Sequence, residues 1–426
     1  MRILLLGAGG FIGRHILSEL LSHGHEVVGI ARSAGQSAAA WPQASFISVD
    51  LARAINPDDW HGHLVGIDVI VNAAGVLRGR EIDAVHVAMP QALHAAAELA
   101  KIKHFVLISA ISARADVRTD YSRSKLAGEA ALRSSALNWT ILRPSLVYGD
   151  GSYGGTSLIR GLSALPGLIP LPGAGDFAFT PIHARDLART VRIACENGLP
   201  PCQTLEPVGP ETMSLKHLQT RYRAWLGFGP ARYCSVPLPV IRLLGRIGDL
   251  AGNGPIATNS LVQMVAGNAG DSLAFAKAIG FTPRSLEVAF RDRPAQVQDR
   301  WHARLFFLAP ALKAVLLMMW LVSAWLGLFH GTAQTSNLVR SIGLPQTWAD
   351  PLRIGSSVID IAVAGVLWFD RSAARAALVQ LAVVFGYTIV IGLALPQLWF
   401  DPFGAMLKNI PVMLAIAVYG AIGDKR

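Results

Sequence analysis

Residues 2–13 read Arg-Ile-Leu-Leu-Leu-Gly-Ala-Gly-Gly-Phe-Ile-Gly, a short apolar run that leads into a glycine-rich turn. The apolar run predicts a buried β-strand, and residues 14–21 have the spacing of a helix. Glycines three residues apart let the backbone turn tightly, approach a pyrophosphate and pack the helix against the strand, with the helix N-terminus facing the phosphates. The stretch therefore predicts a dinucleotide-binding site, with cofactor contacts at Gly7, Gly10, Phe11, Ile12 and Gly13.

The end of the second expected strand bears on the choice of cofactor. Residues 25–30 read His-Glu-Val-Val-Gly-Ile, and Ala31-Arg32-Ser33 follows without an acidic residue. In NAD-binding folds an Asp or Glu here accepts hydrogen bonds from the ribose hydroxyls, whereas an Arg accommodates a 2′-phosphate. Arg32 therefore favours NADP(H) over NAD(H), although a solvated surface arginine would give the same sequence.

Two further strand ends are expected to line the same cofactor site. Residues 45–49 predict a third strand followed by Asp50 and Leu51, a position suited to contacting an adenine ring, although an ordinary turn carboxylate would look the same. Residues 67–71 predict a fourth strand, and the small side chains after it let the backbone lie against the cofactor. These small residues follow Asn72, in the order Asn72, Ala73, Ala74 and Gly75.

Strands and helices alternate along the first part of the chain. Residues 84–101 predict a long helix, and residues 104–108 predict a fifth strand that delivers Ser109 to the carboxyl end of the sheet. This alternation predicts an α/β fold, a doubly wound parallel Rossmann sheet. Residues 150–299 are looser and richer in glycine and proline, which predicts a small substrate lobe within a first domain of residues 1–299.

A tyrosine and a lysine begin the next helical stretch, Tyr121-Ser122-Arg123-Ser124-Lys125. Four-residue spacing puts Tyr121 and Lys125 on one helix face. We expect the ammonium to lower the phenol pKa, so that the tyrosine exchanges a proton near neutral pH while the lysine holds a ribose. A chance pair on a solvated face is the alternative, but the glycine turn upstream and Ser109 favour a catalytic set of Tyr121, Lys125 and Ser109.

Together these motifs resemble those of an extended or atypical short-chain dehydrogenase/reductase. They are the Gly-x-x-Gly-x-x-Gly turn, Asn-Ala-Ala-Gly, Tyr-x-x-x-Lys and the later run Arg143-Pro144-Ser145-Leu146-Val147-Tyr148-Gly149. The chain is similar to the NAD(P)-binding group that includes the nucleotide-binding accessory subunit of respiratory complex I. The resemblance implies that Tyr121 is the acid/base and that Lys125 orients the nicotinamide ribose.

One departure from the family pattern bears on catalysis. The carbonyl-polarising hydroxyl usually comes from the second residue of a Ser-Ser pair after the fifth strand, and Ala110 stands at that position. Ser109 or Ser112 can substitute, or either can be a turn serine bonded to nearby backbone. Loss of one donor to a developing oxyanion costs about a hundredfold in rate, so a non-catalytic cofactor-binding role stays open.

The composition sets the last part of the chain apart. The chain has 426 residues, 52% hydrophobic and 15% charged, which is too apolar for an ordinary soluble protein. Its net charge of +10 favours an anionic membrane surface over nucleic acid, because there is no basic run with interleaved aromatic residues. The scattered cysteines, Cys195, Cys202 and Cys234, argue against a disulfide framework or a metal site.

A second domain, residues 300–426, is expected to consist of four transmembrane helices. Apolar segments occupy residues 305–329, 354–369, 376–398 and 403–422. Each segment is near the roughly 20 residues that span a bilayer, the second at the short edge. This third of the chain resembles the DoxX-like family of four-helix membrane proteins.

Positive residues set the expected orientation in the membrane. Those on the expected cytoplasmic side are Arg291, Arg293, Arg300, Arg304, Arg371, Arg375, Lys425 and Arg426. This assignment puts the first domain and the C-terminus in the cytoplasm, with the cofactor. Arg340 and Arg353, in the first outer loop, run mildly against the rule.

Two charged residues fall inside the expected spans. Lys313 lies about 12 Å into the first span at 1.5 Å per residue, and Asp360 falls near the middle of the second. A charge there costs roughly 2.5–3.5 kcal/mol on insertion scales and is usually paired or functional. We expect an Asp360–Lys313 pair, with Lys408 as the competing partner.

Two functions from different classes follow from these features. The first is a membrane-anchored NAD(P)(H)-dependent oxidoreductase, or an epimerase or dehydratase of the same fold, whose small-molecule substrate is lipidic or a quinone because anchoring concentrates the site at the bilayer. The second is a cofactor-binding sensor or assembly factor whose helices recruit a membrane protein partner. Tyr121 and Lys125 favour the first function, and Ala110 favours the second.

Overall fold

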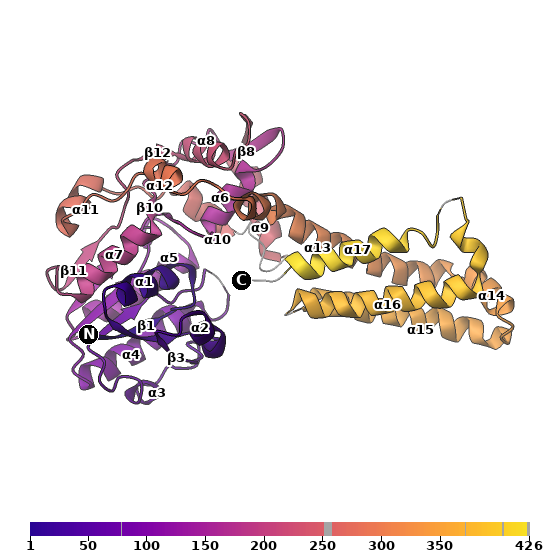
Figure 1. Cartoon of the computed structure of the whole chain (residues 1–426), viewed down its shortest axis with the longest axis horizontal. Coiled ribbons are helices and arrows are strands. Elements are labelled where there is room, and N and C mark those ends of the chain that lie inside the picture. The colour runs from indigo at the N-terminus through magenta and orange to yellow at the C-terminus, as the bar shows by residue number, and fades with distance from the viewer. Residues whose placement is uncertain (78, 251–257, 371, 403, 424–426) are drawn as a thin grey trace. The chain divides into compact units, whose positions relative to one another are not determined.

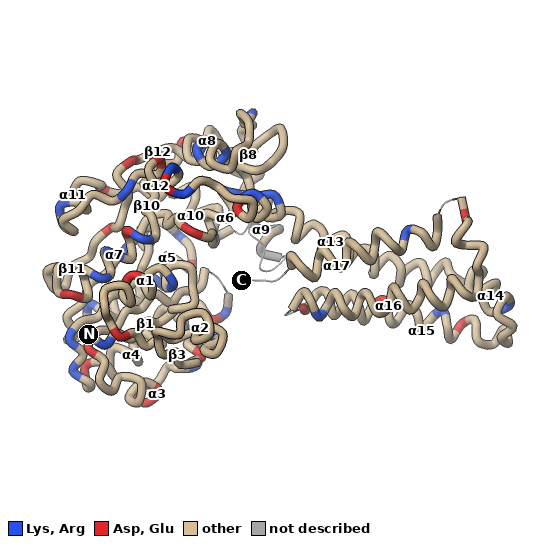
Figure 2. The backbone as a smooth tube through the Cα atoms, viewed as in Figure 1, with Lys and Arg blue, Asp and Glu red and all other residues tan. Residues whose placement is uncertain are grey.

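The chain divides into two compact units in a computed structural model (Figure 1). The units are Met1–Ala303 and Arg304–Arg426, and the residues described are 1–77, 79–250, 258–370, 372–402 and 404–423. Unit 1 contains strands and helices, whereas unit 2 is helical. Figure 2 shows that charged residues are spread over unit 1 and are sparse along the helices of unit 2.

A seven-stranded parallel sheet forms the centre of unit 1, in the order β11-β6-β5-β4-β1-β2-β3. Its strands are β1 (Arg2–Leu6), β2 (Glu26–Ile30), β3 (Ser45–Ile47), β4 (Val69–Asn72), β5 (His104–Ile108), β6 (Trp139–Leu142) and β11 (Gln203–Leu205). The order reverses between β1 and β4, the point at which open α/β sheets bind ligands beyond the carboxyl ends of their strands. The predicted doubly wound Rossmann sheet is confirmed.

Helices cover both faces of this sheet, which explains why its central strands are apolar and buried on both sides. On one face, α1 (Phe11–Ser22) packs beside α7 (Ala184–Cys195). On the other face lie α4 (Met89–Leu99) and α5 (Asp120–Arg133). Alternate residues of β1 point into the two cores. Two short helices complete this part, α2 (Ala34–Ala40) and α3 (Asp58–His61).

Two predicted elements have different bounds in the structure. β3 is shorter than predicted, so Asp50 and Leu51 lie in the turn beyond it. The helix predicted over residues 84–101 begins as a π-helical turn, η1 (Ala84–Ala88), and ends before Lys101, whose φ of 54° stops a helix. The π turn changes which side chains of this segment face α5, and such turns often occur at functional sites.

A lobe with its own apolar core follows β6. Its core includes Leu171, Phe179, Leu218 and Tyr222, and its short strands form the pairs β7–β10, β9–β12 and β8–β13. The elements are β7 (Val147–Tyr148), α6 (Gly155–Ser163), β8 (Leu168–Pro172), β9 (Ala178–Phe179), β10 (Ile182–His183), β12 (Met213–Ser214), α8 (Leu215–Trp225), β13 (Arg232–Val236), α9 (Leu238–Leu250), α10 (Thr258–Val265), α11 (Ser272–Ile279) and α12 (Leu286–Asp292). Of these, α11 packs against the core of the sheet.

Among its described residues, unit 2 has three helices long and apolar enough to cross a membrane. They are α13 (Val297–His330), which begins in unit 1, α15 (Ala349–Trp368) and α16 (Ala373–Ala394). The fourth helix, α17 (Asn409–Ile422), has 14 residues and is shorter than the predicted segment 403–422, because the chain turns at Gly404 with a φ of 65°. The loop after α13 contains α14 (Thr332–Ser341), which the sequence analysis did not predict. The short 3-10 helix η2 (Gln346–Trp348) precedes α15. A second one, η3 (Pro396–Trp399), follows α16.

The expected Asp360–Lys313 pair is wrong. Lys313 Nζ pairs with Asp370 Oδ1 at 2.6 Å, and Asp360 instead accepts a hydrogen bond from Ser323 Oγ at 2.6 Å. Ser323 follows Lys313 by ten residues and Asp360 precedes Asp370 by ten, so the two contacts lie about 15 Å apart along antiparallel α13 and α15. The helix register therefore puts Lys313 level with the end of α15 and not with its middle.

Hydroxyl groups also contact both carboxylates. Asp360 also accepts a hydrogen bond from Tyr387 at 3.3 Å, and Asp370 accepts one from Tyr419. The competing partner Lys408 makes no ion pair with Asp360 in the part of the chain that is described. Three of the positive residues used for the expected orientation lie outside the described residues, namely Arg371, Lys425 and Arg426.

Candidate functional site

The turn between β1 and α1 has room for backbone only. Gly7 has a φ of 75°, and a Cβ there would lie 2.9 Å from a backbone oxygen of the turn after β4. A Cβ on Gly13 would lie 2.0 Å from the Gly7 oxygen, so α1 packs directly on the turn. Gly10 is the N-cap of α1 and offers no side chain to its first N–H groups, at Phe11 and Ile12. These donors are left for an anion, which fits a dinucleotide pyrophosphate.

The turn after β4 lies against the turn formed by Gly7, Gly10 and Gly13, which we call the glycine cradle. The Ala73 N–H donates to the backbone oxygen of the last residue of β1 at 3.1 Å. Buried Asn72 accepts a hydrogen bond from the Ala74 N–H through Oδ1 at 3.1 Å, which fixes the turn. Gly75 is exposed, and a Cβ there would lie 3.4 Å from Lys125 Nζ. The structure thus brings both predicted turns together with Lys125.

Arg32, Asp50 and Leu51 lie just past the ends of β2 and β3. The exposed Arg32 guanidinium makes no hydrogen bond or ion pair with any described residue. The Asp50 carboxylate accepts a hydrogen bond from the Ala52 N–H at 3.2 Å and pairs with Arg53 at 3.3 Å, as an ordinary turn carboxylate does. Leu51 packs against the core on the α4 face. Arg32 is therefore available to a ligand, and Asp50 is engaged locally.

Tyr121 and Lys125 lie on one face of α5, as their spacing predicts. Thr119 caps this helix by accepting a hydrogen bond from the Ser122 N–H at 3.1 Å. Lys125 Nζ lies 5.9 Å from the centre of the Tyr121 ring and donates to the Ile108 oxygen at 3.0 Å. The Tyr121 hydroxyl donates to no described residue. Lys125 therefore bridges the end of β5 and the turn after β4, beside a phenol that has no partner in the described chain.

Burial dominates the electrostatics of this pair. It raises the pKa of Tyr121 to about 12, with a smaller contribution from Tyr153, and lowers the pKa of Lys125 to about 8 against the effect of Glu129. The expected lowering of the Tyr121 pKa is therefore wrong for this chain. Desolvation of the phenolate outweighs one ammonium that hydrogen-bonds a backbone oxygen. Tyr121 is accordingly protonated at neutral pH.

His86, which the sequence did not predict as a site residue, lies on η1 and contacts both motifs. His86 Nε2 accepts a hydrogen bond from the Val76 N–H at 3.1 Å, so the ring proton is assigned to Nδ1, which donates to Ser124 Oγ at 2.8 Å. Burial and the charge of Lys125 lower its pKa to about 3, and its ring meets the Tyr121 ring edge-on at 5.6 Å. No sequence signal marks this residue, because the π turn that aims it is not visible in the hydrophobic pattern.

Ser109 is tied into a buried ion-pair network. Its Oγ donates to Glu129 Oε1 at 2.6 Å. Glu129 is fully buried and pairs with Arg143 at 2.6 Å and with Arg133 at 3.0 Å. Because a hydroxyl has one proton, this contact leaves Ser109 none for a carbonyl oxygen. The network favours a structural role for Ser109.

Ser112, the other candidate hydroxyl, lies in the turn that precedes α5. Its side chain is buried, and its hydroxyl makes no hydrogen bond with the residues that the structure describes. Ser122 Oγ donates to the Arg114 oxygen at 2.9 Å, which holds this turn against the first turn of α5. Ser112 is thus on a segment fixed beside Tyr121, with a proton that no described group takes up.

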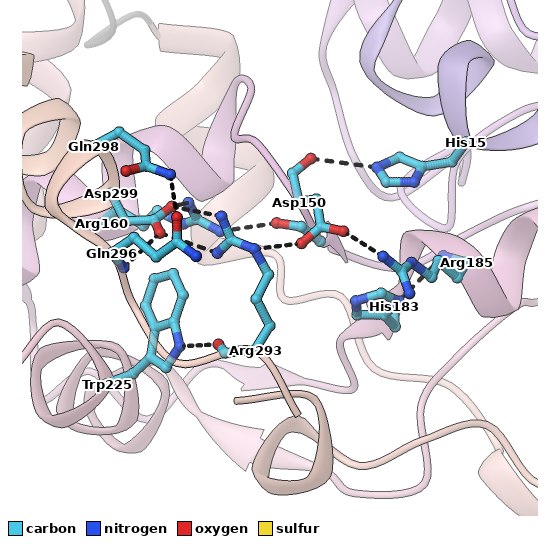
Figure 3. A network of polar contacts seen from close by, with 11 residues as sticks. His15, Asp150, Arg160, His183, Arg185, Trp225, Arg293, Gln296, Gln298 and Asp299 are labelled. Carbon is cyan, nitrogen blue, oxygen red and sulfur yellow. Dashed lines mark hydrogen bonds and ion pairs between the residues drawn. The ribbon is translucent and has the colours of Figure 1, made fainter. Parts of the chain in front are cut away.

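A polar network connects the loop after β7 with α1, α7 and the start of α13 (Figure 3). Asp150 pairs with Arg185 at 2.8 Å and with Arg293 at 2.6 Å, and its backbone oxygen lies 3.3 Å from His15 Nε2. Burial raises the pKa of Asp150, but the two guanidinium groups outweigh it and keep that pKa below the usual value. His183 caps α7, where its Nδ1 accepts a hydrogen bond from the Arg185 N–H at 3.2 Å.

The same network fixes the first turn of α13. Asp299 pairs with Arg293 at 3.0 Å and with Arg160 at 3.5 Å, and the Arg160 guanidinium lies 4.9 Å from the centre of the Trp225 ring. The Trp225 indole N–H donates to the Arg293 oxygen at 2.8 Å. These contacts anchor the beginning of α13 in unit 1, close to the loop that follows β7.

Two parts of the chain match known protein families. Residues 7–166 match a family described as NAD(P)H-binding, and residues 317–417 match the DoxX-like family. The glycine cradle fits the first match, and the long apolar helices fit the second. The chain joins an NAD(P)H-binding Rossmann domain to a DoxX-like domain. The predicted resemblance of the Rossmann domain to extended short-chain dehydrogenases/reductases is confirmed.

Two relatives show what this Rossmann domain is similar to. A ceramide reductase of Caulobacter vibrioides is 27% identical over 196 residues, which cover 45% of this chain and 60% of that protein. The mitochondrial NADH dehydrogenase (ubiquinone) 1 alpha subcomplex subunit 9 of Arabidopsis thaliana is 24% identical over 268 residues, 58% of this chain and 63% of that one. The chain thus spans less than two thirds of the length of either relative.

Solved structures with this fold include epimerases. A nucleoside-diphosphate-sugar epimerase from Staphylococcus aureus has a TM-score of 0.56 at 18% identity, and the match covers 68% of this chain and all of that one. A UDP-glucuronic acid 4-epimerase from Bacillus cereus, in complex with NAD, has a TM-score of 0.55 at 19% identity. The match covers 72% of this chain and 98% of that one. At these identities the likeness shows the fold of the Rossmann domain.

Proposed function

We propose that this protein is a membrane-anchored NAD(P)(H)-dependent oxidoreductase in which Tyr121 exchanges a proton with a carbonyl or hydroxyl substrate. The observation that carries the proposal is the Tyr121 phenol, which lies beside Lys125 and donates to no described residue. A bound NAD(P)H would supply a hydride to the carbonyl carbon. Tyr121, protonated because its pKa is about 12, donates its proton to the oxygen, which becomes the hydroxyl of the product.

The neighbours of Tyr121 have supporting roles in this proposal. Lys125, with a pKa lowered to about 8, is still largely charged at neutral pH and would hold the cofactor ribose. It donates a proton to the Tyr121 phenolate and then regains one from water. His86 orients the Tyr121 ring and the turn after β4. Ser112, and not Ser109, polarises the carbonyl, because the Ser109 proton is donated to Glu129.

The remaining cofactor contacts follow the two turns and the ends of β2 and β3. The glycine cradle would hold the pyrophosphate, because no side chain caps the first N–H donors of α1. Arg32, exposed and without a partner in the described chain, binds a 2′-phosphate, so NADP(H) is preferred over NAD(H). The cofactor contacts are Gly7, Gly10, Phe11, Ile12, Gly13, Arg32, Asp50, Leu51, Asn72, Ala73, Ala74, Gly75 and Lys125.

The DoxX-like domain anchors the enzyme and determines its substrate class. Its apolar helices cross the membrane, with the Rossmann domain and the C-terminus in the cytoplasm, since Arg304 and Arg375 flank spans on that side. A lipid-derived carbonyl is the substrate class favoured here, because the site is tethered at the bilayer and a relative of the Rossmann domain is a ceramide reductase. A quinone is the second candidate substrate.

The test uses the full chain in nanodiscs. We expect NADPH to bind more tightly than NADH by fluorescence titration, and Arg32→Ala to remove most of the difference. We expect NADPH to be consumed with a panel of ketolipids and quinones by the wild type and by Arg185→Lys, a surface control, but not by Tyr121→Phe. If the wild type and Tyr121→Phe bind NADPH equally well and neither consumes it with any acceptor, the oxidoreductase proposal is contradicted.

Two specific observations keep a second function in view. Ala110 stands where the family has a catalytic hydroxyl, and the Arabidopsis relative is a subunit of a respiratory complex. In this alternative the cofactor is structural and the helices bind a membrane protein partner. Co-purification of one stoichiometric membrane protein, lost when Gly13→Val blocks the cradle but kept in Tyr121→Phe, would favour it. An epimerase or dehydratase would instead convert its substrate without net consumption of NADPH.

A further inference from the structure

Helix α9 of the lobe presents an apolar face to the outside. Val240, Leu243 and Leu244 are 44%, 56% and 44% exposed, and their spacing of three and four residues puts them on one side of the helix. The other side of α9 is anchored, because Ile241 is buried in the lobe core with Leu261 of α10. The packing of the lobe therefore fixes the apolar face outward.

Two exposed arginines lie together on one flank of α9, with Arg246 nearer the apolar face than Arg242. At 100° per residue, Arg242 and Arg246 lie between the buried side of α9 and its outward apolar side. Neither guanidinium forms an ion pair with a residue that the structure describes. A helix with outward aliphatic side chains and flanking unpaired arginines has the chemistry of one that lies in the surface of an anionic bilayer.

The lobe that carries α9 also holds the start of α13. The first turn of α13 belongs to unit 1, where Asp299 and Ala303 are buried. The apolar stretch that starts at Leu305 follows two residues later. Asp299 pairs with Arg160 of α6, so the helix that leads into the apolar stretch is fixed to the lobe that carries α9.

We propose that α9 is an interfacial helix that lies in the plane of an anionic membrane surface. Val240, Leu243 and Leu244 enter the boundary between head groups and acyl chains, and Arg242 and Arg246 contact lipid phosphates. This proposal rests on the membrane anchoring proposed above. It gives the lobe a fixed contact with the leaflet that supplies a lipidic substrate.

The test measures contact between single side chains and lipid in the full chain. Cys202 and Cys234 are replaced by serine, buried Cys195 is kept, and Leu244→Cys is labelled with an environment-sensitive fluorophore. In nanodiscs with anionic lipid and a shallow nitroxide quencher, we expect roughly twofold or greater quenching at 244 and a blue shift. A matched label at Leu273→Cys on α11, which is 83% exposed, should be quenched little.

Two further variants separate the possible outcomes. Arg242→Gln with Arg246→Gln should reduce the quenching at 244 in anionic but not in zwitterionic nanodiscs. A label at Leu321→Cys in α13, measured with a nitroxide placed deep in the acyl chains, reports anchoring itself, so its failure to be quenched would count against the proposed function. Quenching at 321 with equal, weak quenching at 244 and 273 would overturn the α9 proposal alone. A label at 244 that is shielded from water but not quenched by the nitroxide lipid, in a particle of doubled mass, would show that a second copy covers the apolar face. That result would also overturn the α9 proposal.

Discussion

Ser109 and Ser112 are three residues apart but differ in what their hydroxyls contact. Ser109 supports buried Glu129, so Ser109→Ala should lower the free energy of unfolding by about 1–3 kcal/mol and change kcat little. Ser112→Ala should lower kcat about a hundredfold and leave NADPH binding and the melting temperature nearly unchanged. Parallel measurement of kcat and Tm checks both. A larger loss of kcat in Ser109→Ala than in Ser112→Ala would reverse the assignment.

Three buried histidines make the Rossmann domain sensitive to acid. Burial lowers the pKa values of His86, His94 and His183 to about 3, 4 and 3, from an unfolded value of 6.5. Below about pH 6.5 the unfolded chain therefore binds more protons than the folded chain, and stability falls as the pH drops toward 4. The melting temperature should be clearly lower at about pH 5 than at about pH 7.5.

His94 provides a direct check of this acid sensitivity. Both of its ring nitrogens are buried without a partner among the described residues, and its ring packs edge-on against Phe105 at 4.7 Å. His94→Phe removes the cost of burying two unpaired polar atoms, so it should keep or raise the melting temperature and weaken its dependence on pH. Exposed His61→Phe is the control and should leave the pH dependence as it is. An unchanged pH dependence in His94→Phe would contradict the account.

At the scale of elements, the contacts between α13, α15 and α17 depend on one ion pair. Lys313→Ala removes the cation that pairs with the buried Asp370 carboxylate, and should destabilise the DoxX-like domain by about 3–5 kcal/mol. Lys313→Met with Asp370→Leu removes both charges and should cost less than Lys313→Ala alone. Thermal unfolding in nanodiscs gives the comparison. If the double variant costs as much stability as Lys313→Ala or more, the pair does not act as a unit.

Asp360 is expected to tolerate a neutral side chain. It accepts hydrogen bonds from Ser323 and Tyr387 and has no cation beside it in the described chain. An amide oxygen can accept the same bonds, so Asp360→Asn should keep expression and melting temperature close to those of the wild type. Asp360→Leu leaves both hydroxyls unpaired and should be less stable. Loss of fold in Asp360→Asn would indicate that its charge is required.

The sequence could predict elements that repeat a local pattern. The glycine turn, the strands and Tyr121 with Lys125 follow from spacing along a single segment. It could not predict contacts that depend on how distant segments align. The partners of Lys313 and Asp360 depend on the register of α13 against α15. The direction of the His86 side chain depends on a π turn. The surroundings of Ser109 depend on a carboxylate 20 residues away.

At the scale of the whole molecule, the order of the two domains was predictable and their detailed bounds were less so. The loss of charge after residue 304 separates them in the sequence. The first turn of α13 nevertheless packs into unit 1 through Asp299, which hydropathy alone does not show. A helix that is fixed at its start therefore connects the cofactor-binding domain with the DoxX-like domain.

The most direct test of the account is the transfer of hydrogen from the cofactor to a lipid. The full chain in nanodiscs is incubated with lipid extract and NADPH carrying deuterium at C4 of the nicotinamide, and the lipids are analysed by mass spectrometry. We predict one deuterium on the carbon that bears a new secondary hydroxyl with the wild type and none with Tyr121→Phe, although both bind NADPH. Binding by both proteins with no deuterium in any lipid and no quinol formed would contradict the central claim and favour a cofactor-binding partner protein.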